Sequence, residues 1–168
     1  MKAVQNMEKF MKPIRLVLTL LATLAVIGVL TSYTYKAYDM RVKSASNKRM
    51  IAKTKVNGKT AYFLLDTGAS VGVMDYGKVK EYDLVIGKRY HGEIIGSGGK
   101  LTNVRYCHSI AEILERKIPQ FLLADISEIV SSIKRETGIE ILGIISLPQM
   151  KLANLGIDCN DNEIIIEQ

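Results

Sequence analysis

The sequence predicts a mainly β domain with one or two short helices, preceded by an N-terminal transmembrane helix. Three observations lead to this fold class. An uncharged apolar run covers residues 16–35, strand-like stretches separated by glycine turns begin at Met50, and only residues 127–138 repeat apolar positions with a helical period. A chain of 168 residues has room for one modest domain that buries a core without disulfides.

The N-terminal part, residues 1–35, is basic at first and then uncharged. The uncharged run from Leu16 to Tyr35 holds about 20 residues, which is roughly the length of a helix that crosses a bilayer. Tyrosines gather at its far end, where aromatic rings favour the headgroup layer. We expect a single-pass membrane protein, with the polar and basic residues 36–49 as a linker at the membrane surface.

Two other interpretations of this run stay open. The basic residues ahead of it are typical of a secretory signal peptide, and a cut near Ser32 would then leave a secreted domain. The run could instead be a buried helix of a soluble protein. Charges on its two sides are nearly balanced, so the positive-inside rule does not fix the orientation. We expect the domain on the extracytoplasmic side, because a lone N-terminal signal-anchor usually exports the rest of its chain.

The net charge of +6 is unevenly distributed and does not indicate a nucleic-acid partner. Residues 1–55 carry a net charge of +9, whereas residues 56–168 carry −3. The basic part lies beside the apolar run, where it can meet anionic lipid headgroups. The rest of the chain is mildly acidic and would repel a phosphate backbone, so we expect no binding to nucleic acid.

The cysteines and histidines do not predict a metal or cofactor site. Cys107 and Cys159 both fall in probable strands, where a free cysteine behaves as a small hydrophobic residue. Whether the two are bonded stays open. Together with His91 and His108 they lack the spacing of a zinc site, so we expect no metal and no cofactor.

From Met50 onward the chain reads as paired strands. MIAKTKV and TAYFLLD flank Asn57-Gly58, and an Asn-Gly pair between two such runs is the strongest short-range hairpin signal. YHGEII and KLTNVRYCHSIAEIL flank a second tip, residues 96–99, whose glycines let the turn adopt many backbone states. KIPQFLLADI follows as another strand, with Pro119 near its start.

The last third of the chain contains the one clear helix of the domain. Ser127 is the expected cap, Gly138 ends the helix, and Ile129, Val130 and Ile133 share one face. IEILGIISL is apolar at nearly every position, as expected of a buried strand that runs into a turn. LGIDCNDNEIIIE closes the chain as a hairpin around residues 160–162.

Asp66 is the leading candidate for a functional residue. It follows the apolar stretch AYFLL, so it should emerge where a buried strand leaves the core. A carboxylate there is partly desolvated, and such a carboxylate without a function is uncommon. The alternative is that Asp66, Thr67 and Gly68 simply make a turn, since Asp bonds its own backbone and Gly accepts positive φ.

The order of these elements over residues 50–168 resembles that of the retropepsin-like aspartic proteases, the single-lobed relatives of pepsin. The last hairpin resembles that of the bacterial members of this family. The family signature apolar-apolar-Asp-Thr-Gly-Ala matches residues 64–69, and its apolar-apolar-Gly element matches residues 141–143. The resemblance implies a closed β-barrel domain with one short helix before and one after the Ile-Leu-Gly strand. It also implies a protease domain that spans residues 50–168 and follows the linker.

The resemblance further implies the chemistry. In this chemistry, two carboxylates that share one proton hydrolyse a peptide bond. The aspartic-protease dyad is the established example of such a pair. This chain has one Asp-Thr-Gly, so the second Asp66 must come from another copy in a homodimer. Thr67 would bond to the partner's loop, and Gly68 would let backbone N–H groups approach. Ala69, small for the same reason, would stand beside the substrate, and Ser70 would be either a substrate contact or a plain turn hydroxyl.

The glycine tip resembles the flap that closes over a peptide substrate in this family. Its residues are Gly96, Ser97, Gly98 and Gly99, and its edge would pair with the peptide backbone. Ile94, Ile95 and Ile141 are candidates for the side-chain pockets, with a role in the core as the alternative for each. The rival functions are a catalytically inactive, membrane-tethered peptide-binding or dimerisation module of the same fold, and a small envelope protein without a peptide groove.

Overall fold

A computed structural model describes residues 16–30, 40–96 and 99–167, and the chain divides into two units, Met1–Met40 and Arg41–Gln168. In the first unit, residues 16–30 form a helix whose apolar side chains are exposed. In the described parts of the chain, no helix combines the length and the apolarity that a membrane crossing requires. The rest of the uncharged run, up to Tyr35, lies outside the described residues.

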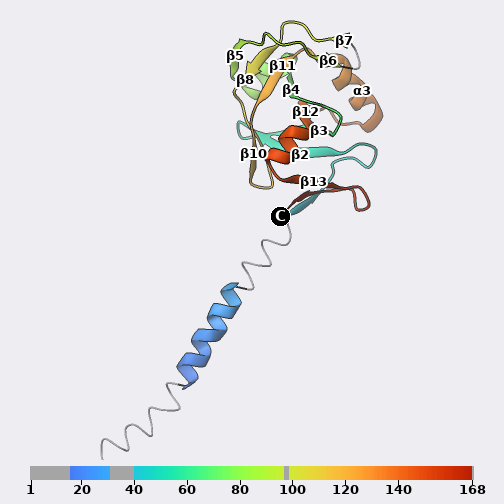
Figure 1. The fold of residues 1–168 in the computed structure, drawn as a ribbon. Coiled ribbons are helices and arrows are strands. Elements are labelled where there is room, and N and C mark those ends of the chain that lie inside the picture. Colours follow the sequence, from blue (N-terminus) through green and yellow to red (C-terminus); the bar gives the residue numbers. More distant parts are fainter. Residues whose placement is uncertain (1–15, 31–39, 97–98, 168) are drawn as a thin grey trace, which may run out of the picture. The chain divides into compact units, whose positions relative to one another are not determined.

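The second unit is mainly β with a few short helices, as the sequence predicts (Figure 1). The strands are β1 (Arg41–Lys43), β2 (Ile51–Val56), β3 (Lys59–Asp66), β4 (Gly72–Asp75), β5 (Ile86–Arg89), β6 (Ile95–Gly96), β7 (Gly99–Lys100), β8 (Arg105–Cys107), β9 (Ala111–Ile113), β10 (Arg116–Ile118), β11 (Phe121–Ala124), β12 (Gly143–Ser146), β13 (Leu155–Asp158) and β14 (Glu163–Ile166). The helices are η1 (Tyr76–Lys78), α2 (Val79–Tyr82), α3 (Ser127–Thr137) and α4 (Leu147–Leu152).

The main sheet has the strand order β10-β9-β2-β3-β12-β4-β11-β8-β5. β12 runs parallel to β3 and antiparallel to β4, and β11 runs parallel to β4. The predicted closed barrel is wrong for the described strands, because β10 and β5 are edge strands that do not pair with each other. The register of β5 against β8 shifts between Ile86 and Arg89, and such an irregularity bends a strand and ends its pairing.

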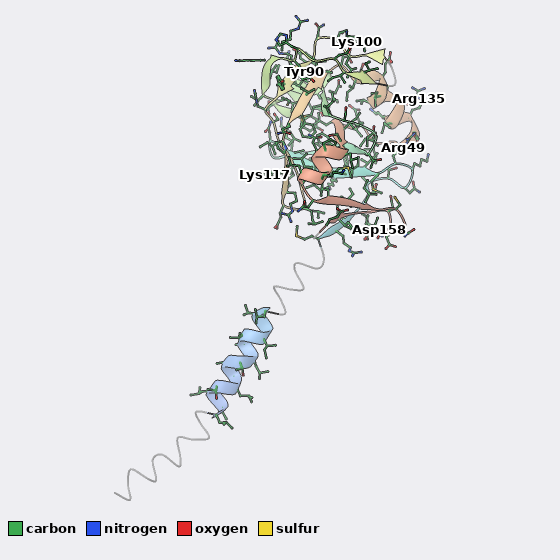
Figure 2. The ribbon with its side chains drawn as sticks, viewed as in Figure 1. Arg49, Tyr90, Lys100, Lys117, Arg135 and Asp158 are labelled. Carbon is green, nitrogen blue, oxygen red and sulfur yellow. The ribbon has the colours of Figure 1, made fainter. Side chains whose placement is uncertain are left out.

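The domain begins earlier in the chain than the sequence predicts. Part of the expected linker, residues 41–43, forms β1, which pairs with β14 in a separate sheet of order β1-β14-β13. The Ser44 side chain then accepts a hydrogen bond of 2.9 Å from the Ile51 N–H group. Arg41 and Lys43 look like linker residues in sequence, but both form ion pairs with Glu163 across the strands. Lys100 of β7 and Asp158 of β13 lie at opposite ends of this unit (Figure 2).

The backbone angles at turn residues show which of the predicted turns and strand ends form. The hairpin at Asn57-Gly58 is confirmed, with φ values of 49° and 78°. The expected strand across Pro119 is wrong, because β10 ends before the proline and Gln120 takes a left-handed φ of 66°.

The predicted helix is confirmed as α3 and ends at Gly138, which has a φ of 78°. Its expected cap is wrong: Ile126 precedes the helix, and the Asp125 carboxylate accepts the Ser127 N–H.

The helices otherwise match the expectation of one before and one after the Ile-Leu-Gly strand. α3 precedes β12 and α4 follows it, whereas η1 and α2 between β4 and β5 were not expected. The predicted last hairpin is confirmed as β13 and β14. Both cysteines are free; Cys107 is buried and Cys159 is exposed.

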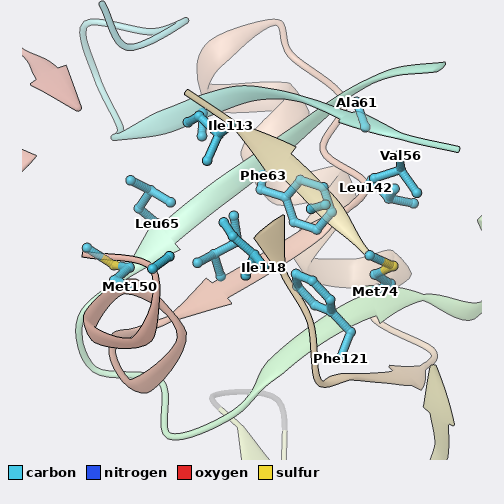
Figure 3. Packing of buried hydrophobic residues seen from close by; sticks show 14 of the residues in the cluster. Val56, Ala61, Phe63, Leu65, Met74, Ile113, Ile118, Phe121, Leu142 and Met150 are labelled. Carbon is cyan, nitrogen blue, oxygen red and sulfur yellow. The ribbon is translucent and has the colours of Figure 1, made fainter. Parts of the chain in front are cut away.

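Two hydrophobic clusters lie on the two faces of β3. Phe63 and Leu65 belong to the first cluster, where the two phenylalanine rings of Phe63 and Phe121 lie 5.4 Å apart (Figure 3). Tyr62 and Leu64 pack against the second cluster, which is built mainly from β4, β11, α3 and Ile141. Successive side chains of a strand point to opposite faces, so a single strand contributes to both clusters.

Candidate active site

Asp66 is the last residue of β3, and its side chain is half-buried. Because side chains alternate along a strand, Asp66 lies on the same face of β3 as Tyr62 and Leu64. The strand therefore brings the carboxylate out of the core at the point where the sheet ends, which is the position that the sequence predicts for it.

The loop after Asp66 folds back on the carboxylate. The Gly68 N–H donates a hydrogen bond of 2.8 Å to Asp66 Oδ1, and the Ala69 N–H donates one of 3.2 Å to the Asp66 carbonyl oxygen. A Cβ atom at position 68 would lie 3.3 Å from Asp66 Oδ1, which is a tight contact. The absence of a side chain at Gly68 therefore allows the backbone to approach the carboxylate.

A second strand ends beside this loop. Ser146 of β12 pairs in register with Asp66, and since β3 and β12 are parallel their carboxyl ends meet at the same edge. The Leu147 N–H donates a bond of 3.3 Å to the Ala69 carbonyl oxygen and joins the loop to the start of α4. The Asp66 loop is thus attached to the following helix as well as to its own strand.

Ser146 and Gln149 support this edge and were missed in the sequence. The Ser146 N–H and hydroxyl both bond to Gln149 Oε1, at 3.0 and 3.2 Å, and Gln149 Nε2 donates to the Pro119 carbonyl oxygen at 2.8 Å. Both side chains are buried. A signal for them was present, because a serine followed three residues later by glutamine after an apolar run is typical of a helix capping box.

The packing around Gly143 explains why the Ile-Leu-Gly element ends in a glycine. A Cβ atom at this position would overlap the Val73 carbonyl oxygen of β4. The glycine lets β12 and β4 pack closely enough to pair Gly143 with Met74. Since β12 carries Ser146 to the side of Asp66, this close packing sets the position of the loop.

Thr67 and Ser70 are both exposed and each lies beside a hollow of its own. Thr67 lines a cavity of about 670 Å³ together with Leu65, Met150 and Ile157. Ser70 lines another, of about 570 Å³, together with Ser146, Gln149 and residues of β11. Within the described residues, the Thr67 hydroxyl has no hydrogen-bond partner.

The predicted flap and pocket residues lie apart from these hollows. Gly96 is the last residue of β6 and Gly99 is the first residue of β7, while Ser97 and Gly98 fall outside the described residues. Ile95 is 74% exposed. Ile94 is partly buried against the second cluster and Ile141 is completely buried within it. The structure therefore brings Ile94 and Ile141 together in one apolar cluster and leaves Ile95 in solvent.

The chemistry available at this edge is that of one positioned carboxylate. Asp75, the buried aspartate of β4, accepts N–H groups of Gly77 and Ile126. Because β4 runs antiparallel to β12, Asp75 lies at the opposite end of the sheet from Asp66 and Ser146. In the parts of the chain that the structure describes, no group of three or more His, Cys, Asp or Glu side chains could hold a metal ion.

Comparison with known proteins finds no matching family profile and no matching curated protein. Similar solved structures include a retroviral protease and a retroviral protease-like domain. The EIAV protease complexed with the inhibitor HBY-793 shares 22% identity over 66% of this chain and 92% of that one, with a TM-score of 0.47. The retroviral protease-like domain of Ddi1 from Leishmania major shares 16% over 71% of this chain and 89% of that one, with a TM-score of 0.48. Both TM-scores are below 0.5, so the assignment of the candidate site rests on the Asp66 loop.

Proposed function

We propose that the domain is an aspartic endopeptidase that works as a homodimer, in which Asp66 of each copy supplies one carboxylate. The observation that carries this proposal is the placement of Asp66. It ends a buried strand, its carboxylate accepts the Gly68 N–H at 2.8 Å, and the loop around it is exposed. A second chain can therefore approach the carboxylate directly.

The proposed reaction uses the two aspartates in opposite protonation states. The ionised carboxylate takes a proton from water, whose oxygen attacks the peptide carbonyl carbon, while the protonated one donates its proton to the carbonyl oxygen. The tetrahedral species then collapses: the C–N bond breaks as the leaving nitrogen takes a proton from one carboxyl group, and a hydroxyl group of the diol gives a proton back to the other carboxylate, which restores the shared proton. Repulsion between two like charges keeps one proton shared between the carboxylates.

Three features of the chain support the second copy. The sequence has a single Asp-Thr-Gly, and Asp75 lies at the wrong end of the sheet to complete the pair. The Thr67 hydroxyl is exposed and free to bond across a twofold axis. The lining of the hollow beside Thr67 includes the half-buried apolar side chains of Met50, Leu147 and Ile157, which a partner would cover.

The test is peptide cleavage by the full-length protein and its Asp66→Asn variant, measured by mass spectrometry on a mixed peptide library. We expect cleavage by the wild type and none by the variant, because an amide neither activates water nor shares the proton. Asp83→Asn is the matched control, since Asp83 is an exposed aspartate paired with Lys59 and should be dispensable. Cleavage by a verified Asp66→Asn dimer would overturn the proposal, and peptide binding without any cleavage would favour the inactive binding module.

We also propose that the uncharged run over residues 16–35 anchors the protein in a membrane, with the domain on the extracytoplasmic side. The run is free of charge and is roughly as long as a helix that crosses a bilayer, and a lone N-terminal signal-anchor usually exports the rest of its chain. The full-length protein should stay with membranes in high salt and at alkaline pH, and a chain that begins at residue 41 should not. Release by salt alone, or a mature N-terminus near Ser32, would contradict the anchor.

A further inference from the structure

The hollow of about 570 Å³ lies along the same edge of the sheet as Asp66. Asp66 pairs in register with Ser146 at the end of β12, and β4, which is antiparallel to β12, begins at this edge with Gly72. Gly72 pairs with Phe121 of β11, and Phe121 pairs with Cys107 of β8. Each of the four strands after β3 thus contributes one residue that lines the hollow. The hollow therefore extends along the sheet edge from the strand next to Asp66 outward to β8.

The spacing of the strands gives the distance from Asp66. Neighbouring strands of a sheet lie about 4.8 Å apart, so β8, the fourth strand along from β3, lies roughly 19 Å from Asp66. An extended peptide advances about 3.3 Å per residue and covers this distance in about six residues. A peptide that runs from Asp66 along the sheet edge therefore places over the hollow the residues about two to six positions from the bond at Asp66.

The outer part of the hollow, at β8, is aromatic and apolar. Tyr106 is 46% exposed, and its ring meets that of Tyr90 edge-on, with the ring centres 5.4 Å apart. Ile110, which is 38% exposed, lines the hollow with them. Of the described residues that line the hollow, none is Asp, Glu, Lys or Arg. Because aromatic rings pack well against other large apolar groups and an unpaired charge is costly to desolvate, this lining suits a large apolar side chain.

Hydrogen bonds fix the inner part of the hollow to the Asp66 edge. The buried Gln149 side chain accepts the Ser146 N–H at 3.0 Å and donates to the Pro119 carbonyl oxygen at 2.8 Å. Pro119 also lines the hollow, shortly before β11 begins. One side chain therefore joins the wall of the hollow to the strand beside Asp66. A substrate side chain bound in the hollow would hold its peptide at a fixed position relative to Asp66.

We propose that this hollow is a distal specificity site, which binds an aromatic or large aliphatic side chain of the substrate about four to six residues from the scissile bond. Tyr106 and Ile110 are the residues that select this side chain. The proposal rests on the proposed function of Asp66, because it takes the sheet edge as the path of the substrate.

The twofold symmetry of the proposed dimer extends this preference. One hollow lies on each side of the dyad, so the preference applies on both sides of the bond. The substrate class is therefore an extended protein segment with large apolar residues at two places, about eight to twelve residues apart.

The first test is the cleavage profile of the full-length protein on the mixed peptide library, read by mass spectrometry. We expect aromatic and large aliphatic residues to be enriched about fivefold at about four to six residues from the cleaved bond. Tyr106→Ala should lose this enrichment. Tyr76→Ala is the matched control and should keep the wild-type profile, because Tyr76 is 45% exposed but follows Asp75 at the opposite end of the sheet. No distal enrichment in the wild type, or equal enrichment in Tyr106→Ala, would overturn the proposal.

A second variant gives the hollow a new chemistry, so its result does not depend on a loss. Ile110→Glu places a carboxylate in the uncharged lining and should change the distal preference from apolar side chains to Lys and Arg. Partial unfolding does not produce a new preference of this kind. An apolar preference that persists unchanged in Ile110→Glu would refute the role of the hollow in specificity.

The last measurement separates this proposal from the proposed function. A wild type that cleaves peptides without the distal preference refutes the distal site and leaves the protease assignment intact. If the wild type cleaves nothing, the protease assignment fails, and the hollow is tested directly with N-acetyl-p-benzoylphenylalanine amide, which attaches to nearby side chains under near-ultraviolet light. We expect the label on residues 106–110 of the full-length wild type and about tenfold less in Ile110→Glu. Equal labelling of the two proteins would show that the hollow is not an apolar binding site.

Discussion

At the scale of single residues, the site depends on positions where a side chain is absent. Gly68 brings its N–H within 2.8 Å of the Asp66 carboxylate, and a Cβ there would be in tight contact with the same oxygen. Gly143 lets β12 approach β4, since a Cβ would overlap the Val73 carbonyl oxygen. The motif residues around Asp66 are thus explained by backbone packing as well as by chemistry.

Gly143→Ala should destabilise the domain by about 1–3 kcal/mol, because the added methyl group has to displace the backbone of β4. Urea denaturation of the variant and the wild type measures this difference. Gly96→Ala is the matched control: nothing lies within 4 Å of its added Cβ, so its stability should be close to that of the wild type. Equal stability of the two variants would contradict the close packing of β12 and β4.

At the scale of elements, Glu140 joins α3 to the start of α2. Hydrogen bonds with Lys134 and Lys78 lower the pKa of the Glu140 carboxyl group from its usual 4.5 to about 2. A carboxyl group whose pKa is lowered by folding stabilises the folded state above its unfolded pKa. This stabilisation is therefore complete above about pH 5 and is lost as the pH falls from 4.5 towards 2.

Glu140→Gln should lower the stability at pH 7 by about 1 kcal/mol or less, because the side chain is 36% exposed and solvent screens its ion pairs. Thermal unfolding across a pH series measures the difference. The wild type and the variant should differ at neutral pH and converge near pH 2. A difference that stays constant down to that pH would show that the carboxylate charge is not its cause.

Helices and turns that depend on neighbouring residues could be predicted from the sequence. Strands that form only by pairing with segments far away in the sequence could not. The hairpin at Asn57-Gly58 was predictable from its turn residues, and α3 was predictable from the helical spacing of its apolar residues. Both signals lie within a short stretch of sequence. β1 could not be predicted, because residues 41–43 are basic and become a strand only through pairing with β14 and Glu163. Asp66 was predictable from the strand before it, whereas the register that places Ser146 beside it depends on a parallel pairing of distant segments.

At the scale of the whole molecule, β1 makes residues 41–49 part of the domain. Val42 packs against the first cluster, and Ser44 bonds to Ile51 at the start of β2. A chain that begins at residue 50 should therefore be less stable than one that begins at residue 41 by about 2 kcal/mol, from lost strand pairing and apolar burial. Urea denaturation of the two chains tests this prediction. Equal midpoints would show that residues 41–49 do not stabilise the domain and belong to the linker.

The central claim is that each active site takes one Asp66 from each of two copies. The most direct measurement is the cleavage rate of mixtures of wild-type and Asp66→Asn protein, refolded together at constant total concentration so that the copies pair at random. If the dyad is shared, only wild-type pairs are active and the rate falls as the square of the wild-type fraction. A rate that falls in direct proportion to the wild-type fraction would mean that a single Asp66 suffices, and would contradict the claim.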